Sequence, residues 1–410
     1  MEIGAKARCA VPCRALGQHE YYFLTTVNAT SLPASLLLSA IHYFFYMKNF
    51  SLRAGRFLTL ALLLISLGLS SCKKDDATTS VTGNWVAGNS FPGVTRSGAV
   101  SFVINGIAYV GTGNDVSNTR LKDFYAFDPT RGSWTQLTPM PAAAPARYLA
   151  AAFATSNRGY VGTGYAQDGT YLSDFWQFDP ATPTVTTTTT NGVTTTTTTV
   201  GTWTRIKDFP LTTAGTGRRG AVAGSINNIG YVGCGFGGNY EKDMYRYDAA
   251  ANSWTDIGFP GNKRVNASAF TLNNVLYMGF GVNNGTTDTQ FWAYDPASTT
   301  SPWTQKRNLA NVSNSTESYD YSGVARTQTA AFAINNLGYV TVGSNSSNLL
   351  TCYVYDPAAD TWALKNPFTG SSRSLPVAFG IGSNGYVGLG SNGATTFDDF
   401  WKFDPNASQQ

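Results

Sequence analysis

Apolar and polar residues alternate in short runs along residues 84–405, and residues that favour turns separate the runs. Two such runs, 100–104 and 107–111, flank the dipeptide Asn105-Gly106. A period of two is typical of β-strands, and Asn-Gly between two alternating runs is typical of a tight hairpin turn. The pattern therefore predicts an all-β domain that is built from hairpins.

One unit of this pattern occurs six times between residues 96 and 405. Each unit has a Tyr-[Val/Met]-x-x-Gly segment, and thirteen to fifteen residues after its glycine comes the Asp that ends an aromatic-x-aromatic-Asp segment. The opening tyrosines are Tyr109, Tyr160, Tyr231, Tyr277, Tyr339 and Tyr386, and tryptophans follow in the first five units at Trp134, Trp203, Trp254, Trp303 and Trp362. Four strands in a unit of about 50 residues resemble the kelch repeat, a β-propeller unit. Kelch units usually carry two adjacent glycines, whereas this chain has Gly-x-Gly, or one glycine in the fifth unit.

The last unit, residues 373–404, has neither a fourth strand nor its tryptophan. A matching segment stands before the first unit, where Trp85 occurs in the sequence GNWVAG. If this segment supplies the missing strand, both ends of the chain lie in one sheet and the ring has no unpaired seam. The sequence therefore predicts a six-bladed kelch-type β-propeller over residues 84–410, closed by its N-terminal strand.

The residues before the propeller resemble a secretion leader. From Met47, a basic stretch and an apolar run lead to Ser70-Ser71-Cys72, which is similar to a bacterial lipoprotein signal peptide with its lipobox. The apolar run is shorter than the about 20 residues that a membrane-spanning helix needs. The resemblance implies that Cys72 is lipidated and becomes the mature N-terminus, so that the protein contacts the membrane through a lipid anchor only.

Three segments of the leader follow from this interpretation. We assign residues 47–71 to the signal peptide and residues 72–83 to a tether, and we interpret residues 1–46 as a start-site artefact, with a genuine N-terminal helix as the alternative. The charged stretch 73–76 is similar to a short tag that sends some lipoproteins to the outer face of the outer membrane, although any solvated linker carries such charges. We therefore expect an outer-membrane or cell-surface location.

Charge and histidine content exclude several functions. The chain has 28 Lys and Arg against 24 Asp and Glu, of which residues 1–71 hold six and two, so the remainder is balanced at 22 against 22. A neutral domain has no broad field to attract nucleic acid, and none is expected as a partner. Both histidines, His19 and His42, lie in the leader. Copper radical oxidases of the galactose oxidase type, which share the kelch resemblance, need histidine ligands, so we exclude that activity and expect no cofactor or metal.

An arginine stands thirteen residues before the repeated tyrosine in every unit: Arg96, Arg147, Arg218, Arg264, Arg326 and Arg373. All six precede the innermost strand, so we expect them at the channel mouth on one face, called here the arginine face. Resemblance to kelch propellers that bind acidic peptides implies that these arginines contact a ligand. The alternative is an architectural role, in which they pair with Asp123, Asp174, Asp243 and Asp399; because Gln290 and Thr351 replace this Asp in units four and five, Arg264 and Arg326 are predicted to be free.

Three functions remain open. The leading hypothesis is a surface-anchored, non-catalytic binding module, monomeric, with a glycan or protein ligand on the arginine face. The second is an enzyme similar to the kelch epimerases of sialic acids, for which Glu317, Asp320 and Tyr321 of the insert 309–325 are candidate groups, Tyr321 being also a candidate ligand contact. The third is a structural component of the envelope. A second insert, the threonine-rich stretch 184–200, is interpreted either as a protruding hairpin or as a flexible, glycosylated loop.

Overall fold

The structure is a computed structural model that describes residues 81–191 and 193–409. In these residues six four-stranded antiparallel sheets surround a central channel, and the only helical element is the 3₁₀ turn η1 (Ser322–Val324). None of the described segments is a helix long and apolar enough to cross a membrane. The prediction of an all-β, six-bladed propeller is confirmed.

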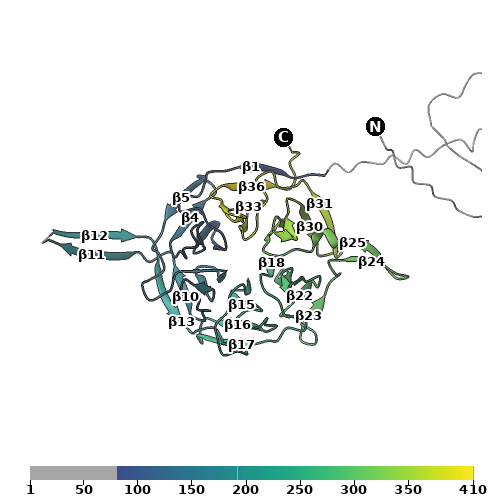
Figure 1. Ribbon diagram of the computed structural model, residues 1–410, viewed down its shortest axis with the longest axis horizontal. Helices are drawn as coiled ribbons and strands as arrows, with labels where there is room; N and C mark the ends of the chain where they lie inside the picture. The colour runs from purple at the N-terminus through teal and green to yellow at the C-terminus, as the bar shows by residue number, and fades with distance from the viewer. Residues whose placement is uncertain (1–80, 192, 410) are drawn as a thin grey trace, which may run out of the picture. The chain divides into compact units, whose positions relative to one another are not determined.

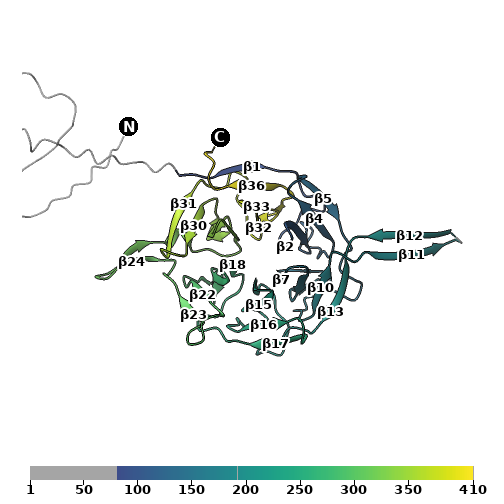
Figure 2. The same ribbon diagram turned by 180° about the vertical axis from the view of Figure 1, so that it is seen from behind.

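Each blade is a meander whose first strand lies innermost, as the strand orders and Figures 1 and 2 show. Blade one consists of β2 (Val100–Ile104), β3 (Ile107–Gly111), β4 (Phe124–Asp128) and β5 (Ser133–Gln136), and blade two of β7 (Ala151–Ala154), β8 (Gly159–Gly162), β10 (Phe175–Asp179) and β13 (Thr202–Ile206). Blade three consists of β14 (Val222–Ile226), β15 (Ile229–Gly233), β16 (Met244–Asp248) and β17 (Ser253–Asp256), and blade four of β18 (Ser268–Leu272), β19 (Val275–Gly279), β22 (Trp292–Tyr294) and β23 (Trp303–Gln305). Blade five consists of β26 (Ala330–Ile334), β27 (Leu337–Thr341), β30 (Cys352–Asp356) and β31 (Thr361–Lys365), and blade six of β32 (Val377–Ile381), β33 (Asn384–Gly388), β36 (Phe400–Asp404) and β1 (Asn84–Ala87).

The N-terminal strand closes the ring as predicted. β1 pairs with β36, with Trp85 opposite Phe403, and the two rings lie 4.5 Å apart. Trp85 is 5% exposed and donates its Nε1–H to the carbonyl of Asn366 in blade five at 3.2 Å. Lys365 binds Thr82 and Pro405, one from each end of the propeller. Blade five therefore holds both ends of the propeller at the seam.

The tryptophans of the fourth strands join neighbouring blades. Trp134, Trp203, Trp254 and Trp303 each donate a hydrogen bond to a carbonyl just after the fourth strand of the preceding blade, at 3.0–3.4 Å, as Trp85 does. Trp362 differs, because its Nε1 is buried without a partner among the described residues. The core lies between the blades, where these rings pack against the tyrosines and phenylalanines of the inner strands, so the wedge-shaped gaps are filled by aromatic side chains.

Six two-stranded ribbons extend the blades. On the arginine face lie β6 (Arg147–Tyr148) with β9 (Tyr165–Ala166), β20 (Val282–Asn283) with β21 (Thr286–Thr287), β28 (Ser344–Asn345) with β29 (Ser347–Asn348), and β34 (Ser391–Asn392) with β35 (Thr395–Thr396). Two longer ribbons, β11 (Thr184–Thr190) with β12 (Val193–Thr199) and β24 (Asn311–Ser313) with β25 (Ser318–Asp320), project outward from the ring. The threonine-rich stretch is therefore a hairpin, the first of its two interpretations.

Candidate functional site

The six repeated arginines lie at one end of the innermost strands, as expected, but every one of them is fully buried. In each blade the guanidinium Nη1 donates to a carbonyl sixteen residues further on, at 2.8–3.3 Å. Four arginines also pair with the aspartates that the sequence proposed: Arg96 with Asp123, Arg147 with Asp174, Arg218 with Asp243, and Arg373 with Asp399. The architectural interpretation of these four pairs is confirmed.

The prediction that Arg264 and Arg326 are free is wrong. Arg264 finds a different carboxylate, because Asp288, two residues before Gln290, lies 3.1 Å from its Nη2. Arg326 has no acidic partner among the described residues, yet its donors are occupied by the carbonyls of Gly323, Val324, Val342 and Thr351 and by the Thr351 hydroxyl. Burial lowers the pKa of Arg326 to about 10, while the nearby Tyr353 and Cys352 act in the opposite direction.

The backbone around the arginines forms two closed rings of hydrogen bonds. In the first ring, the repeated glycine of each blade donates its N–H to the carbonyl of the repeated arginine of the next blade, at 2.7–2.9 Å. The ring begins with the bond from Gly113 to Arg147 and closes with the bond from Gly390 to Arg96. In the second, the residue two places after each arginine donates to its counterpart in the preceding blade at 2.8–3.5 Å; these residues are Gly98, Leu149, Gly220, Asn266, Gln328 and Leu375.

All six residues of the second ring have φ between 52° and 62°, a left-handed conformation that costs energy for side chains other than glycine. The buried guanidinium groups hold the strand ends that form both rings. Their repetition is thus explained by packing, and in this structure none of the six guanidinium groups is exposed to a ligand.

The channel itself is narrow. Small side chains of the innermost strands, such as Ala99, Ala150 and Ala221, line a cavity of about 170 Å³, and the second ring lines a cavity of about 120 Å³ at the mouth. Sites for small molecules typically measure about 300–1,000 Å³. Each of the two cavities is smaller than this, so an extended ligand fits better on the surface around the mouth.

The surface around the mouth is built from the same three positions in every blade. The residue after the arginine, the residue after the repeated glycine and a third residue in the following loop pair across short antiparallel bridges; we call these sets rim triplets. In blade order they are Ser97/Asn114/Arg120, Tyr148/Tyr165/Tyr171, Arg219/Phe236/Tyr240, Val265/Val282/Thr287, Thr327/Ser344/Asn348 and Ser374/Ser391/Thr396. The backbone repeats while the side chains differ, as is common where a rigid scaffold presents a binding surface.

Aromatic and arginine side chains gather on one part of this rim. The aromatic patch consists of Arg120, Tyr148, Tyr165, Tyr171, Arg219, Phe236 and Tyr240, from blades one to three. Consecutive rings are in contact, with centroids 6.1 Å apart for Tyr148–Tyr165, 4.9 Å for Tyr165–Tyr171 and 5.9 Å for Tyr171–Phe236. These rings are half-buried, so each one packs against its neighbours and still reaches solvent.

The two arginines of the aromatic patch differ in their surroundings. Arg120 is 9% exposed, lies 4.0 Å from the ring centre of Tyr148, and is held by Asn114 and Asn118. Arg219 is half-buried between Tyr165 and Phe236, at 5.8 and 5.5 Å from their ring centres. Among the described residues, the Arg219 guanidinium contacts these two rings and forms no ion pair with a carboxylate. It is therefore a positive charge available to a ligand.

The rim of blades five and six carries amides and hydroxyls instead, whereas the triplet of blade four has two valines and one threonine. Asn345 binds the carbonyl of Ala325 within blade five, and Asn392 binds Ser372 within blade six. Asn348 binds Asn392 and so links the loops of these two blades. The arginine face is thus divided into an aromatic part and a polar part around one mouth.

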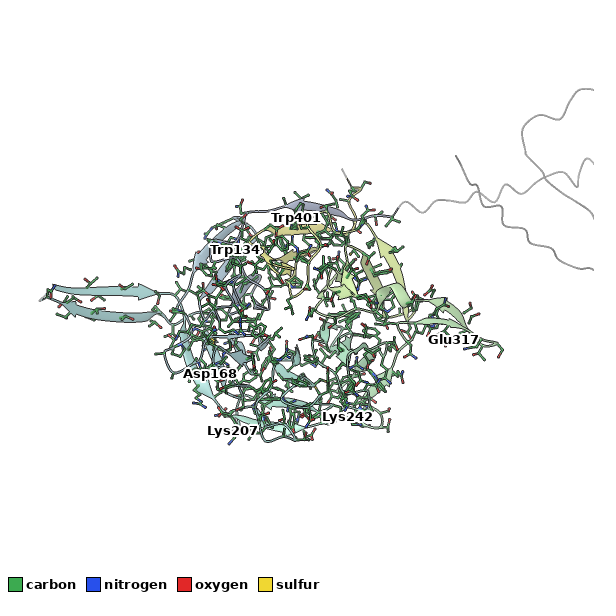
Figure 3. The ribbon with its side chains drawn as sticks, in the orientation of Figure 1. Trp134, Asp168, Lys207, Lys242, Glu317 and Trp401 are labelled. Atoms are coloured by element: carbon green, nitrogen blue, oxygen red, sulfur yellow. The ribbon has the colours of Figure 1, made fainter. Side chains whose placement is uncertain are left out.

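The candidate groups of the insert 309–325 do not join this site. Glu317 lies on the hairpin β24–β25, which projects away from the channel (Figure 3), and it pairs with Arg307 at 3.5 Å. Asp320 accepts hydrogen bonds from Ser322, which lower its pKa. Tyr321 stacks on Tyr319 at 4.6 Å and packs against the core of blades four and five. None of the three lines either of the two cavities of the channel.

The cysteines of the described residues lie inside the blades. Cys234 and Cys352 are free and buried, as the sequence predicts, and burial raises the pKa of each thiol to about 12. No group of His, Cys, Asp and Glu side chains among the described residues is placed to hold a metal ion. Cys72, the predicted lipidation site, and the tether residues up to 80 lie outside the described residues.

Comparisons with known proteins agree with this architecture. Residues 95–141 match the kelch motif. The chain folds as a six-bladed β-propeller with a kelch motif. One similar solved structure, "Structure of YjhT", is 14% identical in sequence, covers 76% of this chain and 95% of that chain, and has a TM-score of 0.58. No curated protein matches the chain in sequence. At this identity the likeness to YjhT concerns the fold alone.

Sequence reasoning missed the aromatic patch because it followed the residues that repeat. The signal lies in the positions that differ between units. The residue after the repeated arginine is Tyr148 in blade two and Arg219 in blade three, and the residue after the repeated glycine is Tyr165 and Phe236; both positions are serine in blade six. In an array of equivalent units, positions that differ between units while the backbone stays the same indicate surface specialised for binding.

Proposed function

We propose that this propeller is a surface-anchored, non-catalytic binding module that holds a glycan on the arginine face, across the aromatic patch. The carrying observation is the row of half-buried rings that includes Tyr148, Tyr165 and Phe236, with the guanidinium of Arg219 between two of them. An amphipathic ring presents an apolar face on which a sugar ring stacks, and its hydroxyl group supplies a hydrogen bond.

Two further features support a saccharide. The small channel leaves the ligand on an open surface, which suits an extended chain of sugars. The polar rim of blades five and six places Asn and Ser side chains within the same face, where they can hydrogen-bond hydroxyl groups.

Arg219 gives the site a preference among saccharides. Its charge is not neutralised by a neighbouring carboxylate among the described residues, and stacking on two rings holds the guanidinium in place. A guanidinium group binds carboxylate in a two-point arrangement. The site therefore favours a glycan that carries a carboxylate over a neutral one.

The test is binding of the chain to an array of neutral and acidic glycans, followed by calorimetry on the best binder. Tyr165→Ala should lower affinity for every glycan, because it removes a ring that contacts both arginines of the patch. Arg219→Gln should lower affinity for acidic glycans and leave neutral ones unchanged. The matched control is Tyr319→Ala, which removes a half-buried ring from the outer hairpin β24–β25 and should bind as the parent does.

Two outcomes would overturn this function. If Tyr165→Ala binds every glycan as the parent does, the patch is not the site. If no glycan binds and an acidic protein does, with loss in Arg219→Gln, the ligand is a protein, the alternative left open by the sequence. The epimerase hypothesis gains no support from the positions of Glu317 and Asp320, which are on the outer hairpin.

We also propose that the protein lies at the cell surface, and the support for this is the lipoprotein-like leader of the sequence. Mass spectrometry of the native N-terminus should find a lipid on Cys72 and no peptide from residues 1–46. The hairpin β11–β12 joins the third and fourth strands of blade two and so leaves from the end of the sheet opposite the arginine face. β1 is also a fourth strand and starts at that opposite end, so a tether attached there leaves the aromatic patch facing outward.

A further inference from the structure

We infer that the hairpin β11–β12 is a self-association element, through which two copies of this chain pair strand to strand. The sequence predicts a monomer, but it does not show that the hairpin has two unpaired strand edges. The ribbon has seven residue pairs, from Thr184–Thr199 to Thr190–Val193, and projects away from the ring in both views (Figures 1 and 2). Nothing else in the described part of the chain pairs with either of its edges.

The register shows which backbone groups face outward. Thr190 lies opposite Val193 in the register, and a pair that flanks a two-residue connection normally exchanges both of its backbone hydrogen bonds. Inward and outward residues alternate along an antiparallel pair. Val185, Thr187 and Thr189 therefore turn their N–H and C=O groups outward on one edge, and residues 194, 196 and 198 do so on the other.

Neither edge is protected against another strand. Natural edge strands are shortened, interrupted by proline or marked with charged side chains, which prevents pairing between molecules. Residues 180–204 contain no charged side chain, and residues 184–199 contain no proline. Threonine favours strands, and uncharged segments of six or seven such residues are the ones that pair between chains. By contrast, four of the other ribbons are only two residues long on each strand.

A second copy is the occupant that the side chains fit best. The hairpin already pairs a threonine run with a threonine run, with hydroxyl contacts of 3.3 Å for Thr187–Thr196 and 3.0 Å for Thr189–Thr194. Equivalent threonine contacts form when two identical edges meet about a twofold axis, and registers that differ by two residues bring nearly the same side chains together. An isolated two-stranded ribbon is only marginally stable in water, whereas two paired ribbons make a four-stranded sheet.

The base of the hairpin leaves both edges accessible. Thr138 of blade one contacts Thr199 through their hydroxyl groups at 2.6 Å and donates its N–H to the carbonyl of Val200 at 2.9 Å. These contacts hold the ribbon only where it leaves the ring. Pairing of two edges buries less than the roughly 1,200 Å² of stable complexes, so we expect a weak, concentration-dependent dimer.

The test is sedimentation velocity of the full chain in mild detergent over a hundredfold range of concentration. The weight-average mass should approach twice that of the monomer at the highest concentration. Thr187→Pro with Thr196→Pro removes one outward N–H from each edge without removing a bond inside the hairpin, and should abolish the dimer. Thr187→Lys with Thr196→Lys keeps the backbone intact and should weaken dimerisation at low salt and less so at high salt.

Hydrogen exchange separates hairpin pairing from association by another surface. The outward amides of residues 185, 187 and 189 should become protected as the concentration of the parent rises, and should stay unprotected in the proline variant. A parent that remains monomeric throughout, a dimer that persists in both variants, or a dimer without protection of these amides would each overturn the inference. A β-strand peptide that binds the monomer without dimerisation would show that the edge serves a different partner.

Discussion

Arg326 provides the sharpest test of what the buried arginines contribute, because an aspartate can be restored beside it. Thr351 occupies the position that is aspartate in blades one, two, three and six, and its hydroxyl already accepts a hydrogen bond from Nη2 of Arg326 at 2.9 Å. Thr351→Asp places a carboxylate where Asp399 meets Arg373 in blade six. The change should therefore stabilise the domain, although it introduces a charge into a buried site.

The magnitude follows from the cost that Arg326 now carries. Burial lowers its pKa from 12.5 to about 10. Since one pKa unit corresponds to about 1.4 kcal/mol, charged Arg326 is disfavoured by roughly 3 kcal/mol relative to the unfolded chain. A carboxylate recovers part of this and has a desolvation cost of its own, so we expect the free energy of unfolding to rise by about 1–3 kcal/mol.

Urea denaturation followed by tryptophan fluorescence measures this change. Thr351→Asn is the matched control, because it has the shape of aspartate without its charge, and it should be close to the parent. Asp399→Thr makes the reverse change in blade six and should destabilise. If Thr351→Asp is no more stable than Thr351→Asn, the carbonyl groups around Arg326 already compensate its charge, and the account of the arginine–aspartate pairs as a source of stability is refuted.

Two further predictions concern ring closure and pH. Trp85→Ala should lower the stability by about 3–5 kcal/mol although Trp85 lies outside the complete repeats, because the side chain is buried in the seam; thermal unfolding measures this, and a melting temperature equal to that of the parent would contradict closure by β1. Burial by itself would raise the pKa of Asp399, but hydrogen bonds from Arg373 and Trp401 and the charge of Arg373 hold it below its ordinary value. A carboxyl group whose pKa in the folded state is below its unfolded value of about 4 stabilises the fold above that pH, and this stability is lost as the pH falls through the folded-state pKa. Asp399→Asn should therefore flatten the acid side of the curve of unfolding free energy against pH. An unchanged slope would contradict this explanation.

Much of the architecture could be predicted because the sequence contains six copies of the same structural unit. Period-two alternation, turns such as Asn105-Gly106 and a tryptophan in each fourth strand are local signals, and the missing last tryptophan pointed to Trp85. Four arginine–aspartate pairs were also predictable from their constant spacing. The prediction for Arg264 failed because Asp288 reaches it from a position two residues away from the repeat pattern, which no spacing rule covers.

The sequence by itself determined the number of blades, the order of strands and the way the ring closes, because hydrophobic periodicity and turn chemistry act between near neighbours in the chain. Only the tertiary structure decided which repeated residues are accessible. Burial is a property of packing between blades, so the arginines that looked like a binding ring proved to be internal supports, while Tyr165, Arg219 and Phe236 came together from two blades. The tertiary structure also shows that the threonine run is a ribbon with two open edges. Whether an edge is open depends on which other strands pack beside it, and the local sequence does not contain that information.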